Sequence, residues 1–141
     1  MNKVITPVYS TALSIVLVAV LLVNGPVLEQ KFFPVTSDSE IIRSESDGPD
    51  HVKIWVAFKK GRTCTFMDLT FYKVGASGHY LQVTHEFLDD KGGGTNSRPE
   101  GKQVAGPWRL AITPEDLMGN LVGYTRHSCH ILWDTVTKFY P

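Results

Sequence analysis

The stretch HVKIWVAFK, residues 51–59, decides the fold that we expect, because apolar residues recur along it at every second position. Successive side chains of an extended chain point to opposite faces, so this alternation is typical of a β-strand with one buried face. The face predicted to be buried holds Val52, Ile54, Val56 and Phe58, and the other face holds Lys53, Trp55, Ala57 and Lys59. The surrounding residues 51–141 are therefore expected to form β-structure.

Further strand-like runs follow this one and are separated by turn-forming residues. They lie at residues 63–74, 79–87, 107–112, 121–128 and 132–140, and residues 88–105 are expected to form a long loop. Thr113 followed by Pro114 and two acids is typical of a helix start, which predicts one short helical turn. About six or seven short strands at this spacing predict an antiparallel β-sandwich domain over residues 51–141.

The large aromatic side chains of this region allow two interpretations. They could form a recognition surface, because aromatic residues are enriched at interfaces, or they could fill the core of a small sandwich. We favour the core. The residues concerned are Trp55, Tyr72, Trp108, Trp133 and Tyr140.

An uncharged segment precedes the β region. Residues 4–28 carry no charge, and residues 12–23 (ALSIVLVAVLLV) are interrupted only by Ser14. A helix needs about 20 such residues to cross a bilayer, so we predict a membrane anchor over residues 1–28, with residues 4–23 in contact with lipid. Asn24-Gly25-Pro26 is expected to end the helix.

The same segment also has features of a cleaved secretory signal. Lys3 supplies a positive flank, but a pair of small residues suited to cleavage is missing after the apolar run. We favour the uncleaved anchor, with the N-terminus in the cytoplasm and the C-terminal domain periplasmic or extracellular. Residues 29–50, which are acidic and rich in Ser, Asp, Gly and Pro, are predicted to form a solvated juxtamembrane linker.

Cys64 and Cys129 are the two cysteines of the chain. In an oxidising compartment an even pair of this kind usually forms a disulfide, so we predict a structural Cys64–Cys129 bond. Their spacing is similar to that of the bridge between the two sheets of immunoglobulin-like domains, and we expect the sandwich to be immunoglobulin-like. His127 stands where those domains have a Tyr, so this similarity is applied to architecture alone.

A metal site is the alternative interpretation of the same region. His127, Cys129 and His130 crowd together, and Cys64 would complete a Cys2His2 set for zinc. His127 and Cys129 would point to one face of a strand while His130 points to the other. We therefore expect no metal and no other cofactor.

No residue of the sequence is marked as a catalytic group by its surroundings. The acidic pairs Asp89-Asp90 and Glu115-Asp116 are expected to face water, and Gly92-Gly93-Gly94 lacks the Lys and helix of a phosphate-binding loop. The 14 Lys+Arg balance the 14 Asp+Glu, which argues against a nucleic-acid partner. We expect a protein that is not an enzyme.

The C-terminal third resembles the tail of small single-span membrane proteins of bacteriophages and prophages. The shared elements are Gly106-Pro107-Trp108, then His127, Cys129, His130 and Trp133, and the final Phe139-Tyr140-Pro141. The resemblance implies a viral origin and says nothing about chemistry.

Three functions follow as hypotheses. The favoured one is a membrane-anchored, non-enzymatic binding or structural module whose partner is an envelope protein or a glycan. The second is a phage lysis or envelope-disrupting accessory protein that acts through its membrane segment. The third is a metal-binding enzyme, supported only by the cluster of His and Cys around Cys129.

Overall fold

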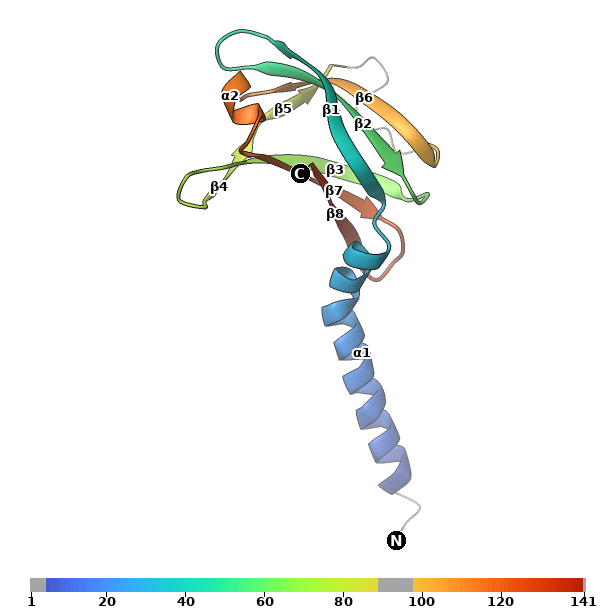
Figure 1. The fold of residues 1–141 in the computed structure, drawn as a ribbon. Coiled ribbons are helices and arrows are strands. Elements are labelled where there is room, and N and C mark those ends of the chain that lie inside the picture. The colour runs from blue at the N-terminus through green and yellow to red at the C-terminus, as the bar shows by residue number, and fades with distance from the viewer. Residues whose placement is uncertain (1–4, 89–97, 141) are drawn as a thin grey trace.

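The apolar N-terminal segment forms one long helix, α1 (Ile5–Phe32), which extends away from the β-strands in the computed structural model (Figure 1). The structure describes residues 5–88 and 98–140. Within α1, the 24 residues Tyr9–Phe32 are long and apolar enough to cross a membrane. The predicted N-terminal apolar helix is thus confirmed. Residue 4 of the predicted bilayer contact, the Asp89-Asp90 pair and the Gly92-Gly93-Gly94 loop lie outside the described residues.

The predicted helix end at Asn24-Gly25-Pro26 is wrong, because α1 contains Pro26 and continues to Phe32. A proline inside a helix lacks a backbone donor, and its ring crowds the carbonyl four residues earlier. In α1 the Asn24 side-chain amide donates to the carbonyl oxygen of Val20 at 2.9 Å. Contacts between the last turns and the β region, described below, outweigh the local signals for a helix end.

In the described part of the chain, eight strands form two antiparallel four-stranded sheets, and Figure 1 shows how the two sheets face each other. The first sheet has the order β1-β2-β6-β5, and its strands are β1 (Thr36–Ser46), β2 (Val52–Lys60), β6 (Gly101–Leu110) and β5 (His85–Phe87). The second has the order β4-β3-β7-β8, with β4 (Tyr80–Val83), β3 (Thr65–Val74), β7 (Leu121–Ser128) and β8 (Asp134–Tyr140). The predicted antiparallel all-β region is confirmed.

The core lies between the two sheets. The predicted inner face of β2 is confirmed, since Val52, Ile54, Val56 and Phe58 are all buried. The Phe58 ring lies 5.3 Å from the ring of Phe139 on β8, and Trp108 on β6 lies 5.9 Å from the same ring. Apolar side chains from both sheets therefore interdigitate, as expected for sheets that pack face to face.

The short helical turn α2 (Pro114–Leu117) follows β6, as the sequence predicted. Thr113 is its N-cap, and its hydroxyl accepts a hydrogen bond from the Asp116 backbone N–H at 3.3 Å. This bond satisfies one of the backbone donors that a helix start leaves without a partner.

The structure differs from the sequence prediction in two segments expected to be irregular. Residues 29–50, predicted to be a solvated linker, contain the end of α1 and all of β1, which pairs along its length with β2. Part of the predicted 88–105 loop belongs to β6, which begins at Gly101. In both cases main-chain pairing with β2 supplies the hydrogen bonds, and polar side chains are well tolerated on the edge strand β1.

The predicted strand at residues 79–87 is divided between the two sheets. Tyr80–Val83 pairs with β3, whereas His85–Phe87 pairs with β6, and Thr84 stands between them. A strand that changes sheet at a bend is one way in which packed sheets form a corner. Leu81 is accordingly exposed, whereas Val83, two residues further along the same segment, is buried.

The disulfide Cys64–Cys129 is confirmed, but its place in the fold is not the predicted one. Cys64 immediately precedes β3 and Cys129 immediately follows β7, and these two strands are neighbours in one sheet, with Thr65 opposite Ser128. The bridge between facing sheets, on which the immunoglobulin-like assignment depended, is therefore wrong. The immunoglobulin-like classification itself stays a prediction.

The prediction that the large aromatic residues fill the core holds for Trp108, which is buried, and in part for Tyr140, which packs against the core cluster. Trp55 instead lies on the outer face of β2, with the Arg43 guanidinium 4.5 Å from the centre of its ring. Tyr72 and Trp133 lie at two surface sites that are described below. Three of the five aromatic residues, Trp55, Tyr72 and Trp133, therefore lie outside the core cluster.

Candidate functional site

The four residues of the hypothetical metal site do not form a ligand set. Cys64 and Cys129 are bonded to each other, His127 is buried between the sheets, and His130 contacts the end of α1. Within the described residues, no group of three or more His, Cys, Asp or Glu side chains could hold a metal ion. The His and Cys residues that are close together in the sequence therefore lie in three different environments in the structure.

Glu29, on the last turns of α1, is the centre of the contact between the helix and the β region. Its side chain is only 9% exposed. One carboxylate oxygen accepts a hydrogen bond from the Arg62 guanidinium at 2.7 Å, and the other accepts one from the Trp133 indole N–H at 2.6 Å. The His130 ring nitrogen Nε2 lies 3.0 Å from that second oxygen. A carboxylate with this many partners is held in place from three directions.

Two further contacts tighten the same junction. Arg62 also donates to the carbonyl oxygen of Phe33 at 3.0 Å, so one guanidinium binds both a helix side chain and the chain just beyond the helix. The Trp133 ring lies directly over Gly25, where any larger side chain would collide with it. Because Gly25 lacks a side chain, the loop between β7 and β8 can lie against the helix surface.

Replacing Glu29 with Gln is expected to loosen this junction. The amide has one acceptor oxygen in place of two charged ones, so the partly buried Arg62 loses its counter-charge and at least one donor loses its acceptor. We expect the free energy of local opening to fall by about 1–3 kcal/mol. Amide hydrogen exchange at the start of β8 and the end of α1 would measure this loss. Glu40→Gln, at an exposed position of β1, is the matched control, and equal exchange in the two variants would contradict the prediction.

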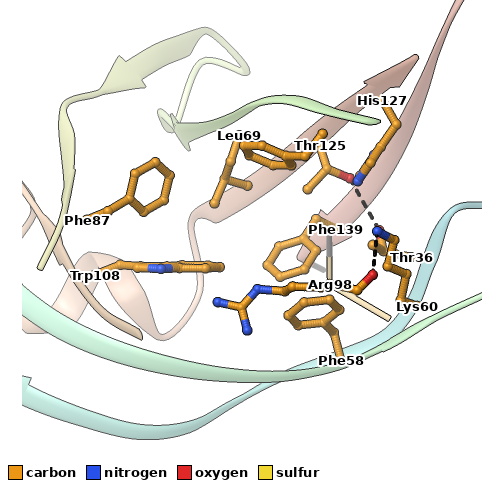
Figure 2. Close-up of a pocket in the computed structure, with 11 residues that line it drawn as sticks. Thr36, Phe58, Lys60, Leu69, Phe87, Arg98, Trp108, Thr125, His127 and Phe139 are labelled. Carbon is orange, nitrogen blue, oxygen red and sulfur yellow. Dashed lines mark hydrogen bonds between the residues drawn. The ribbon is translucent and has the colours of Figure 1, made fainter. Parts of the chain in front are cut away.

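A small cavity lies between the two sheets (Figure 2). Its volume is ≈ 40 Å³, and aromatic rings, including Phe58, Trp108 and Phe139, form much of its wall. A cavity of this size has room for water molecules or a small ion, since one water needs roughly 10–15 Å³. It does not have room for an organic substrate.

The polar side of this cavity contains two buried basic residues, Lys60 and His127. The Lys60 ammonium donates to the carbonyl oxygen of Arg98 at 2.8 Å (Figure 2), and burial lowers the pKa of Lys60. Burial lowers the pKa of His127 to about 4, the positive charge of Lys60 adds to this shift, and the carboxylate of Asp68 opposes it. His127 is therefore neutral at neutral pH. Among the described residues, its Nδ1 and the Trp108 indole nitrogen are buried without a protein hydrogen-bond partner.

The low pKa of His127 predicts that the protein loses stability in mild acid. In the unfolded chain an ordinary His takes up a proton near pH 6.5, whereas the folded imidazole stays neutral down to about pH 4. The unfolded state therefore binds more protons in this window, and the free energy of unfolding falls as the pH decreases from about 6.5 to 4. The maximum loss from this residue is on the order of 3 kcal/mol.

Denaturant titrations of the detergent-solubilised chain between pH 7 and pH 4 would measure this dependence. His127→Gln is expected to flatten it, while His79→Gln, at an exposed position, should leave it unchanged. Part of the slope should survive in His127→Gln, because burial also lowers the pKa of His85. Identical slopes in the wild-type chain and His127→Gln would show that the buried imidazole does not destabilise the fold in acid.

A group of tyrosines lies on the outer face of the second sheet. Tyr72 on β3 has the rings of Tyr80 and Tyr124 at 6.2 and 6.1 Å. Beside them the Arg126 guanidinium donates to the Asp68 carboxylate at 2.6 Å, and together these side chains line an open groove of ≈ 430 Å³. We call this the tyrosine groove, and it is defined by Asp68, Tyr72, Tyr80, Tyr124 and Arg126. Its size is within the range of small-ligand sites.

Comparisons with protein-family models, with curated proteins and with solved structures found no match to this chain. The resemblance of the C-terminal stretch to membrane proteins of bacterial viruses therefore stays a prediction.

Sequence reasoning did not find the two surface sites. Glu29 belongs to a segment predicted to be linker, and its partners lie 33 to 104 residues further along the chain. The tyrosine groove combines side chains from three strands of one sheet. The sequence did contain one usable signal, the alternation along β3. Leu69 and Phe71 are buried, so Asp68, Thr70 and Tyr72 lie on the opposite, outer face of the strand.

Proposed function

We propose that this protein is a membrane-anchored, non-enzymatic binding or structural module that holds its β region outside the cytoplasm, close to the membrane surface. The observation that carries the proposal is the Glu29 junction, which joins a helix apolar enough to cross a membrane directly to a disulfide-bonded β region. A disulfide is typical of proteins in oxidising compartments. In the described residues 5–88, β1 begins at Thr36, four residues after the end of α1, which favours a module whose position relative to the bilayer matters.

The tyrosine groove is the surface that we assign to a partner, and we propose a glycan. Aromatic rings can cover the apolar face of a sugar, while tyrosine hydroxyls and the paired Asp68 and Arg126 can hydrogen-bond to its hydroxyl groups. The charges of the groove compensate each other, which suits a neutral, hydroxyl-rich ligand better than a strongly charged one. Resemblance to phage proteins extends the proposal to the bacterial envelope.

The anchoring part of the proposal is tested by the topology of the full chain in bacterial cells. We expect the chain to stay in the membrane fraction after an alkaline wash, the β region to be digested by protease added to spheroplasts, and non-reducing peptide mapping to recover the Cys64–Cys129 bond. A chain that the alkaline wash removes from the membrane would contradict the proposal. So would a β region that resists the added protease and whose two cysteines are found unbonded. Lysis or loss of membrane potential on regulated expression would support the envelope-disrupting alternative instead.

The glycan part is tested separately with the detergent-solubilised full chain. Neutral oligosaccharides of hexose and N-acetylhexosamine are the probes, and Tyr80→Ala with Tyr124→Ala is the test variant. Met118→Ala is the control, because Met118 is 86% exposed and lies outside the groove. Binding that the double variant loses and the control keeps is the expected result. No binding by the wild-type chain, or equal binding by all three, would reject the groove as a glycan site.

A further inference from the structure

Large apolar side chains are exposed where α1 meets the β region. Phe32, the last residue of α1, is 61% exposed, and Phe33 directly after it is 64% exposed. In the loop between β7 and β8, Ile131 is fully exposed and Leu132 is 55% exposed. We call these four residues the basal apolar surface. Single exposed apolar residues are ordinary, but a group of them in one place marks an interaction site.

The β7–β8 loop lies beside the last turns of α1 (Figure 1). The Trp133 ring contacts Gly25, and the Trp133 indole and the His130 ring both contact Glu29. Gly25 is seven residues before the end of α1, which at 1.5 Å per residue corresponds to roughly 10 Å along the helix axis. The loop therefore extends back along the helix from the β region, in the direction of the membrane.

The length of the apolar helix brings this loop to the border of the hydrocarbon layer. A bilayer core about 30 Å thick needs about 20 helical residues. The segment from Tyr9 to Leu28 has this length. Tyr9 and Trp133 would then lie at the two interfaces, where Tyr and Trp are enriched in membrane proteins. Glu29 would lie just outside the core, where its pairing with Arg62 compensates its charge.

We propose that the basal apolar surface inserts into the lipid interface as a second membrane contact beside the helix. This inference rests on the membrane anchoring proposed above, and it identifies the phospholipid bilayer as the partner of the β region itself. Ile131 and Leu132 lie between His130 and Trp133, which contact Gly25 and Glu29 of α1, and Val27 and Leu28 of this part of the helix are exposed as well. Because the same part of α1 belongs to the apolar span, this favours lipid over a protein partner. A second contact would fix the tilt of the β region, which a single helix alone leaves open.

Fluorescence quenching by lipids brominated on their acyl chains tests this contact. The full chain is placed in phosphatidylcholine vesicles, and one tryptophan is added by Ile131→Trp or by Leu132→Trp. The matched control is Met118→Trp, which is also highly exposed but follows α2, at the end of the β region away from α1 (Figure 1). The emission of the wild-type chain is subtracted in each case.

We expect the tryptophan added at position 131 or 132 to emit at shorter wavelength and to be quenched several-fold more than the one at position 118. Equal quenching at the three positions, in vesicles that retain the chain after an alkaline wash, would overturn the lipid contact and leave the anchor standing. A chain that is lost in the wash would overturn both. A blue-shifted but unquenched tryptophan at position 131 would mean that protein covers this surface, which also contradicts the proposal.

Discussion

A chain that ends at Leu132 is expected to show no cooperative unfolding transition. The deletion removes β8, which pairs with β7 and carries the buried Thr135, Thr137 and Phe139. The Phe139 ring contacts the rings of Phe58 and Trp108 in the facing sheet, and loss of this one buried Phe costs on the order of 3–5 kcal/mol. Small proteins have only about 5–15 kcal/mol of stability in total.

The deletion also removes contacts that tie the helix to the sheets. The Thr137 hydroxyl accepts a hydrogen bond from the buried Val35 backbone N–H at 3.3 Å, and Trp133 contacts both Gly25 and Glu29. Near-ultraviolet circular dichroism during heating of the detergent-solubilised chain would detect the loss of fixed aromatic packing. A chain that ends at Tyr140 keeps all of β8 and is the control, with wild-type unfolding expected. A sharp transition in the chain ending at Leu132 would show that β8 is dispensable.

This prediction shows how far sequence reasoning reached at the C-terminus. The strand expected within residues 132–140 is confirmed, with Thr135, Thr137 and Phe139 on its buried face, because period-2 burial is a local property. The same reasoning extended the strand back to Trp133 and placed it in the core, which is wrong. Trp133 precedes β8 and packs against Gly25, more than 100 residues away in sequence. No local pattern marks such a contact.

The candidate sites follow the same rule. The buried face of β2 and the capped turn at Thr113 depend on neighbouring residues and were predictable. By contrast, β1 is acidic and rich in serine, and it is a strand because β2 supplies pairing partners along its length. The change of sheet at Thr84 likewise depends on the positions of β3 and β6. Tertiary context thus decided that β1 is a strand where composition predicted a linker, and that the strand predicted at residues 79–87 is divided between two sheets.

The disulfide gives the second large expected effect: replacing Cys64 and Cys129 by serine should lower the free energy of unfolding by about 4 kcal/mol. The bond closes a loop of 65 residues, and in the chain-entropy model a crosslink of that span restricts the unfolded state by about this amount. In the folded state it joins the ends of neighbouring strands, next to the Thr65–Ser128 pair, and so fixes the register of β3 against β7.

Urea titrations of the full chain with and without reductant would measure this effect. The double variant, either single serine variant and the reduced wild-type chain should share one lowered midpoint, because each lacks the crosslink. Ser128→Ala is a control beside the bond that keeps it, and its midpoint should stay close to that of the oxidised chain. Since Cys129 begins the loop that contacts Glu29, reduction should also speed hydrogen exchange at Trp133. The contrary result is a urea midpoint that reductant does not change, in a chain whose cysteines are shown by peptide mapping to be bonded. It would mean that strand pairing alone fixes β3 against β7 at this end of the sheet.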